Sequence, residues 1–144
     1  MELKKNYSIK TGHAHMDIQA IHQFLCLESY WAKGISMEMV EKALQHSYCI
    51  GVFIGDKQIG FARLITDYTT FAYLADVYIL EQHRGKGLSK KLMEYIMMLD
   101  EVKGMRRILL ATLDAHALYN QYGFQSPKNP ESLMEIKRNN LYNK

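Results

Sequence analysis

The 144-residue chain has few cysteines and no long apolar run, and these shortages exclude several classes of protein. Its two cysteines, Cys26 and Cys49, stand in apolar contexts without metal-ligand spacing, which predicts reduced core thiols in a cytoplasmic protein. None of the six histidines has such spacing, so we expect no metal. No segment approaches the length of a membrane span, and the first residues lack the apolar run of a signal peptide, so we expect no membrane partner.

The charges also lack any basic block that could follow a nucleic-acid backbone, so a nucleic acid is not an expected partner. The 18 basic and 15 acidic residues are scattered, and the net charge of +3 suits an anionic cofactor. With 48% hydrophobic and 23% charged residues, the composition predicts one globular domain over residues 1–144. The oligomeric state stays open, a homodimer included.

Apolar periodicity predicts alternating strands and helices. Expected strands cover residues 7–10, 48–54, 58–65, 71–80, 107–113 and, as a last edge strand, 133–137. Expected helices begin at the caps Asp17 and Ser36, at Leu88, and at about Ala115, the last with Asp114 as its cap and Gly123 closing it.

The order of these elements predicts the fold class. The turn Gly55-Asp56-Lys57 indicates an antiparallel hairpin, and the strand, glycine turn, helix and strand over residues 71–113 indicate a parallel βαβ crossover. We therefore expect an α/β fold with a mixed sheet of about six to seven strands and helices on both faces.

The sequence Arg84-Gly85-Lys86-Gly87-Leu88-Ser89 places a glycine-rich turn between a strand and a helix. The first N–H groups of a helix have no internal partners and favour an anion, and glycines allow close approach to the backbone. The spacing matches neither a P-loop nor a dinucleotide fingerprint. From the turn alone, a plain helix-capping turn is an equal alternative.

Two segments resemble the GNAT superfamily of N-acetyltransferases. Val77 to Ser89 is similar to its acetyl-CoA signature (Arg or Gln, two residues, Gly, one residue, Gly or Ala), although Ser89 stands where Gly or Ala is usual. Ala115 to Phe124 is similar to its Ala-x-x-x-Tyr-x-x-x-Gly-Phe block. The resemblance covers essentially the whole chain and implies an N-acetyltransferase.

The resemblance implies that the pantetheine of acetyl-CoA pairs with the backbone of Val77 and Ile79, and that an N–H near Val77 or Tyr78 binds the oxyanion. The pyrophosphate would lie on the turn. Thr112 replaces a cofactor-binding Asn of the family. The implied cofactor-binding residues are Val77, Tyr78, Ile79, Arg84, Gly85, Lys86, Gly87, Leu88, Ser89, Thr112 and Tyr119.

Two residues are expected to be catalytic. Tyr119 matches the family's tyrosine, which protonates the leaving thiolate, although a packed helix tyrosine is the alternative. Asp76, inside an apolar strand, matches the acidic position of diamine acetyltransferases and could be the base or bind the amine. Pairing of Asp76 with Arg63 is an equal alternative.

The acceptor pocket of the family would be lined here by Tyr30, Trp31, Arg63, Asp67 and Tyr68, because aromatic rings beside a carboxylate suit a cationic amine. Buried aromatics and a turn Asp explain these residues equally well. We expect acetyl transfer from acetyl-CoA to a small primary amine. A protein N-terminal or lysine acetyltransferase and a non-catalytic CoA-binding regulatory module are the alternatives.

Overall fold

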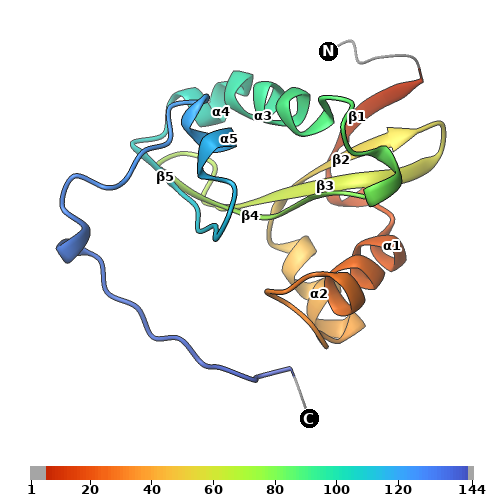
Figure 1. The fold of residues 1–144 in the computed structure, drawn as a ribbon, viewed down its shortest axis with the longest axis horizontal. Helices are drawn as coiled ribbons and strands as arrows, with labels where there is room; N and C mark the ends of the chain where they lie inside the picture. Colours follow the sequence, from red (N-terminus) through yellow and green to blue (C-terminus); the bar gives the residue numbers. More distant parts are fainter. Residues whose placement is uncertain (1–5, 143–144) are drawn as a thin grey trace.

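The computed structural model describes residues 6–142, which build a mixed sheet between two layers of helices (Figure 1). The strand order is β1-β2-β3-β4-β5, with β1 to β4 antiparallel and β5 parallel to β4. This confirms the α/β class, the hairpin and the parallel crossover. The strands are β1 (Tyr7–Thr11), β2 (Tyr48–Ile54), β3 (Lys57–Thr66), β4 (Phe71–Ile79) and β5 (Arg107–Leu109).

The expected number of six to seven strands is wrong for the described residues, which form five. The segment 133–137 is not a strand, and β5 ends at Leu109 rather than at Leu113. Both differences have one physical reason. A strand needs a hydrogen-bonding neighbour. β5 has one only from Arg107 to Leu109, where it pairs with β4, and the segment 133–137 has none among residues 6–142.

The helices α1 (Ile18–Gln23) and α2 (Met37–Gln45) cover one face of the sheet, and α3 (Leu88–Met98), α4 (Asp100–Lys103) and α5 (His116–Asn120) cover the other (Figure 1). A π-helical turn η2 (Phe24–Glu28) extends α1. Asp17 and Ser36 cap α1 and α2 as expected, accepting from the N–H groups of Ala20 and Met39. Short helical turns are η1 (His13–His15), η3 (Glu81–His83) and η4 (Pro130–Ser132).

The start of α5 corrects one expectation. Its N-cap residue is Ala115, whose N–H donates to Thr112 Oγ1 at 3.1 Å, so Asp114 is not the cap. Gly123 ends this region in a left-handed conformation (φ 94°), as expected of a helix-terminating glycine.

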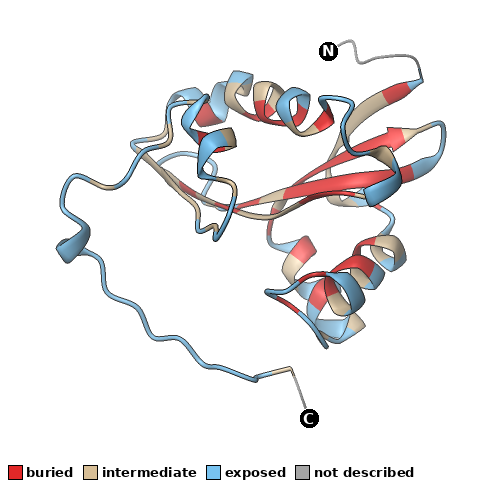
Figure 2. Cartoon of the chain, in the orientation of Figure 1, coloured by how far each residue is buried: buried red, intermediate tan, exposed pale blue. Residues whose placement is uncertain are grey.

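Two apolar clusters fill the spaces between the sheet and its helices (Figure 2). Leu88, Leu92 and Ile96 of α3 pack on one face and are almost fully buried. On the other face, Tyr78 stacks on Phe24 with ring centroids 3.8 Å apart. No helix among residues 6–142 is long and apolar enough to cross a membrane.

β4 and β5 separate along their length, and this separation positions the site. They pair only from Phe71 to Tyr73, so among residues 6–142 the rest of β4 has no strand partner on the side of β5. Opposite this stretch, the β3–β4 register shifts, and Asp76 adopts a left-handed conformation (φ 56°). The resulting β-bulge re-aims the Asp76 side chain, as bulges beside functional sites do.

Candidate active site

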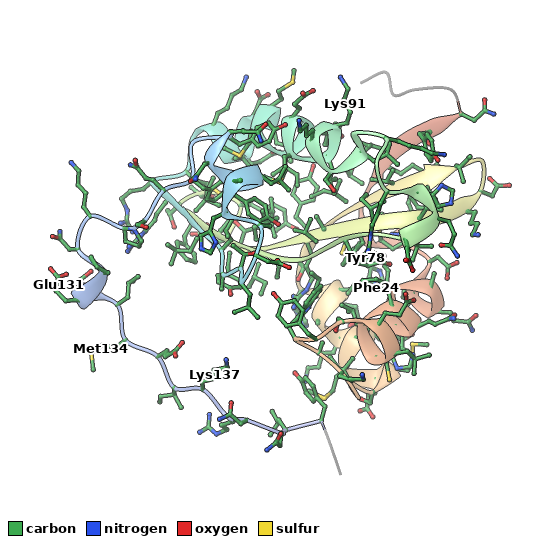
Figure 3. All side chains as sticks on the ribbon, viewed as in Figure 1. Phe24, Tyr78, Lys91, Glu131, Met134 and Lys137 are labelled. Atoms are coloured by element: carbon green, nitrogen blue, oxygen red, sulfur yellow. The ribbon has the colours of Figure 1, made fainter. Side chains whose placement is uncertain are left out.

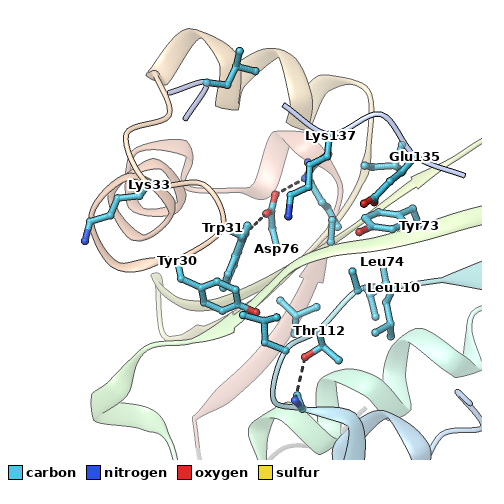
Figure 4. A pocket seen from close by; sticks show the side chains of 18 of the residues that line it. Tyr30, Trp31, Lys33, Tyr73, Leu74, Asp76, Leu110, Thr112, Glu135 and Lys137 are labelled. Atoms are coloured by element: carbon cyan, nitrogen blue, oxygen red, sulfur yellow. Dashed lines mark hydrogen bonds and ion pairs between the residues drawn. The ribbon is translucent and has the colours of Figure 1, made fainter. Parts of the chain in front are cut away.

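A cavity of about 900 Å³ opens where β4 and β5 separate (Figure 4). Its walls come from the loop after η2, from the bulge of β4, from the chain after β5 and from α5. The expected site residues that line it are Tyr30, Trp31, Arg63, Asp76, Val77, Thr112 and Tyr119. The structure therefore brings both expected catalytic residues to one cavity.

Asp76 is held by two neighbours at the cavity wall. Its Oδ2 accepts from Arg63 Nε at 2.6 Å, and its Oδ1 accepts from Trp31 Nε1 at 2.7 Å (Figure 4). The side chain of Asp76 is 9% exposed and that of Arg63 is 16% exposed. The structure thus contains the ion pair between Asp76 and Arg63, which the sequence left as one of two alternatives. It also shows Trp31 as a second hydrogen-bond donor to Asp76.

Tyr119 lies on α5 with its ring buried against Phe124, the ring centroids being 5.9 Å apart. No hydrogen bond joins its hydroxyl to another residue of the described chain, although the residue lines the cavity. Burial, and to a smaller extent Tyr30 and Asp114, raises the pKa of the Tyr119 phenol above its ordinary value. The hydroxyl therefore keeps its proton at neutral pH and remains able to donate it.

The glycine turn after β4 has the geometry of an anion site. Gly85 and Gly87 are left-handed, with φ of 78° and 76°, and a Cβ at either position would meet no atom within 4 Å. Within the described chain, no residue accepts from the backbone N–H groups of residues 85 to 90. Consecutive unpaired N–H groups at the start of an eleven-residue helix fit a phosphate group.

The cationic side chains of this turn are partly engaged. Arg84 Nε donates to the carbonyl of Ile79 at 2.8 Å, and Lys86 Nζ donates to the hydroxyl of Tyr7 at 3.4 Å. That hydroxyl also forms a 2.7 Å hydrogen bond with His83 Nδ1. The Ile79 carbonyl thus already has a donor. Both side chains remain exposed beside the turn.

Tyr30 and Trp31 are half exposed and meet edge to face, with ring centroids 5.0 Å apart. The structure does not bring Asp67 and Tyr68 to the cavity. Asp67 instead caps the β3–β4 turn, where its carboxylate accepts from residues 69 to 71. Tyr68, left-handed at φ 67°, stacks on Tyr48.

Sequence reasoning missed two contributors. Ser47 accepts a 3.0 Å hydrogen bond from Arg63, a contact across the β2–β3 hairpin that no sequence pattern indicates. Residues 135–142 border the cavity on the side away from the sheet, although an edge strand was expected there (Figure 4). Among residues 6–142, no three His, Cys, Asp or Glu side chains gather closely enough to hold a metal ion.

Comparisons with known proteins agree with this fold. The model of the acetyltransferase (GNAT) family matches residues 18–124. A Gibberella zeae protein named as a candidate acetyltransferase is 28% identical over an alignment of 138 positions, which covers 81% of this chain and 77% of that protein.

Solved structures are similar as well. A GNAT-family protein from Xanthomonas campestris pv. campestris is 45% identical and superposes with a TM-score of 0.93 over 97% of this chain and 99% of its own. The superposition leaves out only 3% of this chain, which is too little to contain the whole segment 125–142. A candidate acetyltransferase from Clostridium acetobutylicum, solved with acetyl-CoA, is 13% identical and shares the fold, with a TM-score of 0.69 over 91% of this chain and 96% of its own.

Proposed function

This chain belongs to the acetyltransferase (GNAT) family, and we propose that it transfers the acetyl group of acetyl-CoA directly to the primary amine of a small molecule. The family makes the chain an acyltransferase. The observation that carries the proposal is that the cavity, the free edge of β4 and the glycine turn lie next to one another. The cavity containing Tyr119 and Asp76 lies beside the free edge of β4, and the anion-binding turn follows at the end of that strand.

The cofactor would lie along this path. The free edge of β4 at Val77 to Ile79 offers backbone groups to the amides of pantetheine, as an added strand does. The N–H groups of Gly85 to Ser89 would bind the pyrophosphate, with Arg84 and Lys86 adding positive charge. Thr112 is a weaker contact, because its hydroxyl already accepts from Ala115. The side chains of Tyr78 and Leu88 are buried, so their backbone groups would act.

Bound acetyl-CoA supplies the thioester whose carbonyl carbon receives the amine nitrogen. As that N–C bond forms and the C–S bond breaks, a backbone N–H near Val77 donates to the carbonyl oxygen, where negative charge develops. Tyr119 donates its proton to the departing sulfur, and solvent restores it. An amine that binds as an ammonium loses one proton to water or to a carboxylate of the cavity before it attacks, and it loses a second to water as the amide forms.

Asp76 is proposed to bind the acceptor amine. Each oxygen of an ionised carboxylate can accept more than one hydrogen bond, so the contacts to Arg63 and Trp31 leave acceptor capacity toward the cavity. The rings of Tyr30 and Trp31 stand beside this carboxylate, which suits a cationic group. Residues 135–142 border the opposite side, and a bordered cavity favours a compact acceptor over a protein tail.

The test is release of free CoA thiol from acetyl-CoA, measured with a panel of small primary amines, a lysine-containing peptide and peptides with free N-termini. Acetylation of one or more small amines, dependent on Asp76 and Tyr119, supports the proposal. Activity on the peptides alone would show a protein acetyltransferase. Binding of acetyl-CoA without thiol release above the rate in buffer would show a binding module.

A further inference from the structure

A second, smaller cavity of about 130 Å³ lies between the sheet and α2, and we call it the side pocket. Its apolar walls come from η2, the loop after it and α2, through Leu25, Ala32, Ile35, Val40, Ala43 and Leu44. It lies within the apolar cluster that holds the stacked rings of Phe24 and Tyr78 (Figure 3). Because an apolar cavity of about 150 Å³ holds a benzene-sized group, the side pocket fits an apolar group of about four or five non-hydrogen atoms.

Asp76 and Arg63 form the border between the side pocket and the active-site cavity, because both side chains line both spaces. Trp31 and Tyr142 also line both, whereas Tyr119 lines the larger cavity. An acceptor that binds at this border can therefore direct its amine toward Tyr119 and another group into the side pocket.

Arg63 keeps a hydrogen-bond donor at this border. Its Nε donates to Asp76, and its Nη1 donates to Ser47 at 3.0 Å. Within residues 6–142 no acceptor pairs with the remaining nitrogen, Nη2, and this atom is not closed off from solvent. The N–H groups of a guanidinium match the oxygens of a carboxylate in geometry and charge. Arg63 can therefore bind the carboxylate of a ligand without releasing Asp76.

The charges around Asp76 disfavour an acceptor that is a simple cation. Arg63 already balances Asp76 at 2.6 Å, so an ammonium bound to Asp76 brings a second cation close to the guanidinium. The other charged residues of the larger cavity supply no excess of negative charge, since they are the cations Lys33, Lys137 and Arg138 and the carboxylates Asp114 and Glu135. An acceptor that carries its own carboxylate beside the amine restores the balance.

We propose that the acceptor is a free α-amino acid with a short apolar side chain, of the size of valine, leucine or methionine. This inference rests on the proposed acetyl transfer and specifies its acceptor. Asp76 binds the ammonium group, Arg63 Nη2 binds the carboxylate, and the side pocket holds the apolar side chain. One α-carbon carries all three groups, at the short spacing that a carboxylate and a guanidinium in direct contact require.

The products follow from the same transfer. The amino nitrogen, after losing a proton, bonds to the acetyl carbonyl carbon, the C–S bond breaks, and the sulfur takes the proton of Tyr119. The nitrogen loses its second proton to water as the amide forms. The products are an N-acetyl amino acid and the free thiol of CoA.

The experiment measures thiol release with acceptors that differ only at the carboxyl group: leucine, leucinamide and isopentylamine. In wild type, kcat/KM for leucine should exceed that for either of the others by about ten- to a hundredfold, because both lack the charge-assisted contact to Arg63. Leucinamide has a less basic amine than leucine and isopentylamine a more basic one, so basicity cannot cause the same loss in both. Alanine leaves the side pocket empty and should fall about tenfold or more below leucine.

Two variants assign the contacts. Arg63→Gln removes the guanidinium and should reverse the preference, so that isopentylamine exceeds leucine, because Asp76 then lacks its balancing cation. An Arg63 with a merely structural role would instead lower all acceptors alike. Ala43→Leu fills the side pocket with a good helix former and should lower the ratio of leucine to alanine about tenfold. Gln45→Leu, at an exposed position of α2 outside the pocket, is the matched control and should keep the wild-type ratio.

Each ratio compares acceptors within one protein, so a partly unfolded variant still gives a valid result. Equal kcat/KM for leucine and isopentylamine in wild type would overturn the inference and leave the proposed acetyl transfer intact. An Ala43→Leu protein with the wild-type ratio of leucine to alanine would also overturn it. Thiol release with no amine at all would overturn the proposed function itself.

Discussion

Removal of the Asp76 carboxylate should destabilise the protein through Arg63. The pair joins Arg63 Nε to Asp76 Oδ2 at 2.6 Å, and both side chains are less than one-fifth exposed. Breaking a buried ion pair by removing one partner costs about 3–5 kcal/mol, and the partial exposure here favours the lower end. Asp76→Ala adds about 1 kcal/mol because alanine tolerates the left-handed backbone poorly. The sum, about 4 kcal/mol, should lower the melting temperature by roughly 8–16 °C.

Asp76→Asn separates charge from geometry. Asparagine tolerates the same backbone conformation, and its one acceptor oxygen can accept from Trp31 or from Arg63 but not from both, so the cost should fall only to about 2–3 kcal/mol. The assay is denaturant unfolding of Asp76→Asn, Arg63→Gln and the double variant. The coupling energy between the two sites should be about 1–3 kcal/mol. Strict additivity would refute the reasoning, because it would mean that the ion pair contributes nothing.

Three other perturbations give further expected results. Gly87→Glu places a side chain and a negative charge at the turn and should abolish most acetyl-CoA binding, measured by calorimetry. Gly55→Glu, at a turn glycine with similar φ and equally open surroundings, is the matched control and should bind normally. Acetyl-CoA at a hundred times its Kd should stabilise the fold by about 2.7 kcal/mol, seen as a higher melting temperature; an unchanged melting temperature would contradict the cofactor assignment. Burial raises the pKa of the Cys49 thiol to about 11, while Arg63 lowers this pKa and Asp76 raises it by smaller amounts. The contribution of the protonated thiol to the stability of the fold is therefore complete below pH 9 and is lost as the pH rises through 11. Cys26 should therefore react with a thiol reagent in the native protein, and Cys49 only after unfolding; equal reactivity would be the contrary result.

The parts of the fold that depend on local chemistry could be predicted from the sequence. Asp17 and Ser36 each cap a helix with their own side chain. Gly55 lies in the turn of a hairpin whose two strands, β2 and β3, are consecutive in the sequence. Gly87 and Gly123 are left-handed because of the turns in which they lie. Such features need only a few neighbouring residues, which the sequence shows directly.

The parts that depend on distant partners could not be predicted. An apolar run from Arg107 to Leu113 indicates a long buried strand, but its length depends on its pairing with β4, which ends at Leu109. Asp76 lies in a left-handed bulge that no local pattern indicates, and the bulge aims it at Trp31 and Arg63. Asp67 looks equally suited to a pocket or a turn, and only the fold shows that its oxygens serve the turn.

The most direct test of acetyl transfer in this cavity is the turnover of Tyr119→Phe on an amine that the wild type acetylates. The ring stays, and no hydrogen bond of the hydroxyl within residues 6–142 is lost, so stability and acetyl-CoA binding should be unchanged. If Tyr119 protonates the leaving sulfur, kcat should fall by ~10²–10⁴-fold at saturating acetyl-CoA. An unchanged kcat in a folded variant that binds acetyl-CoA normally would contradict the proposed mechanism and leave Tyr119 as a packing residue.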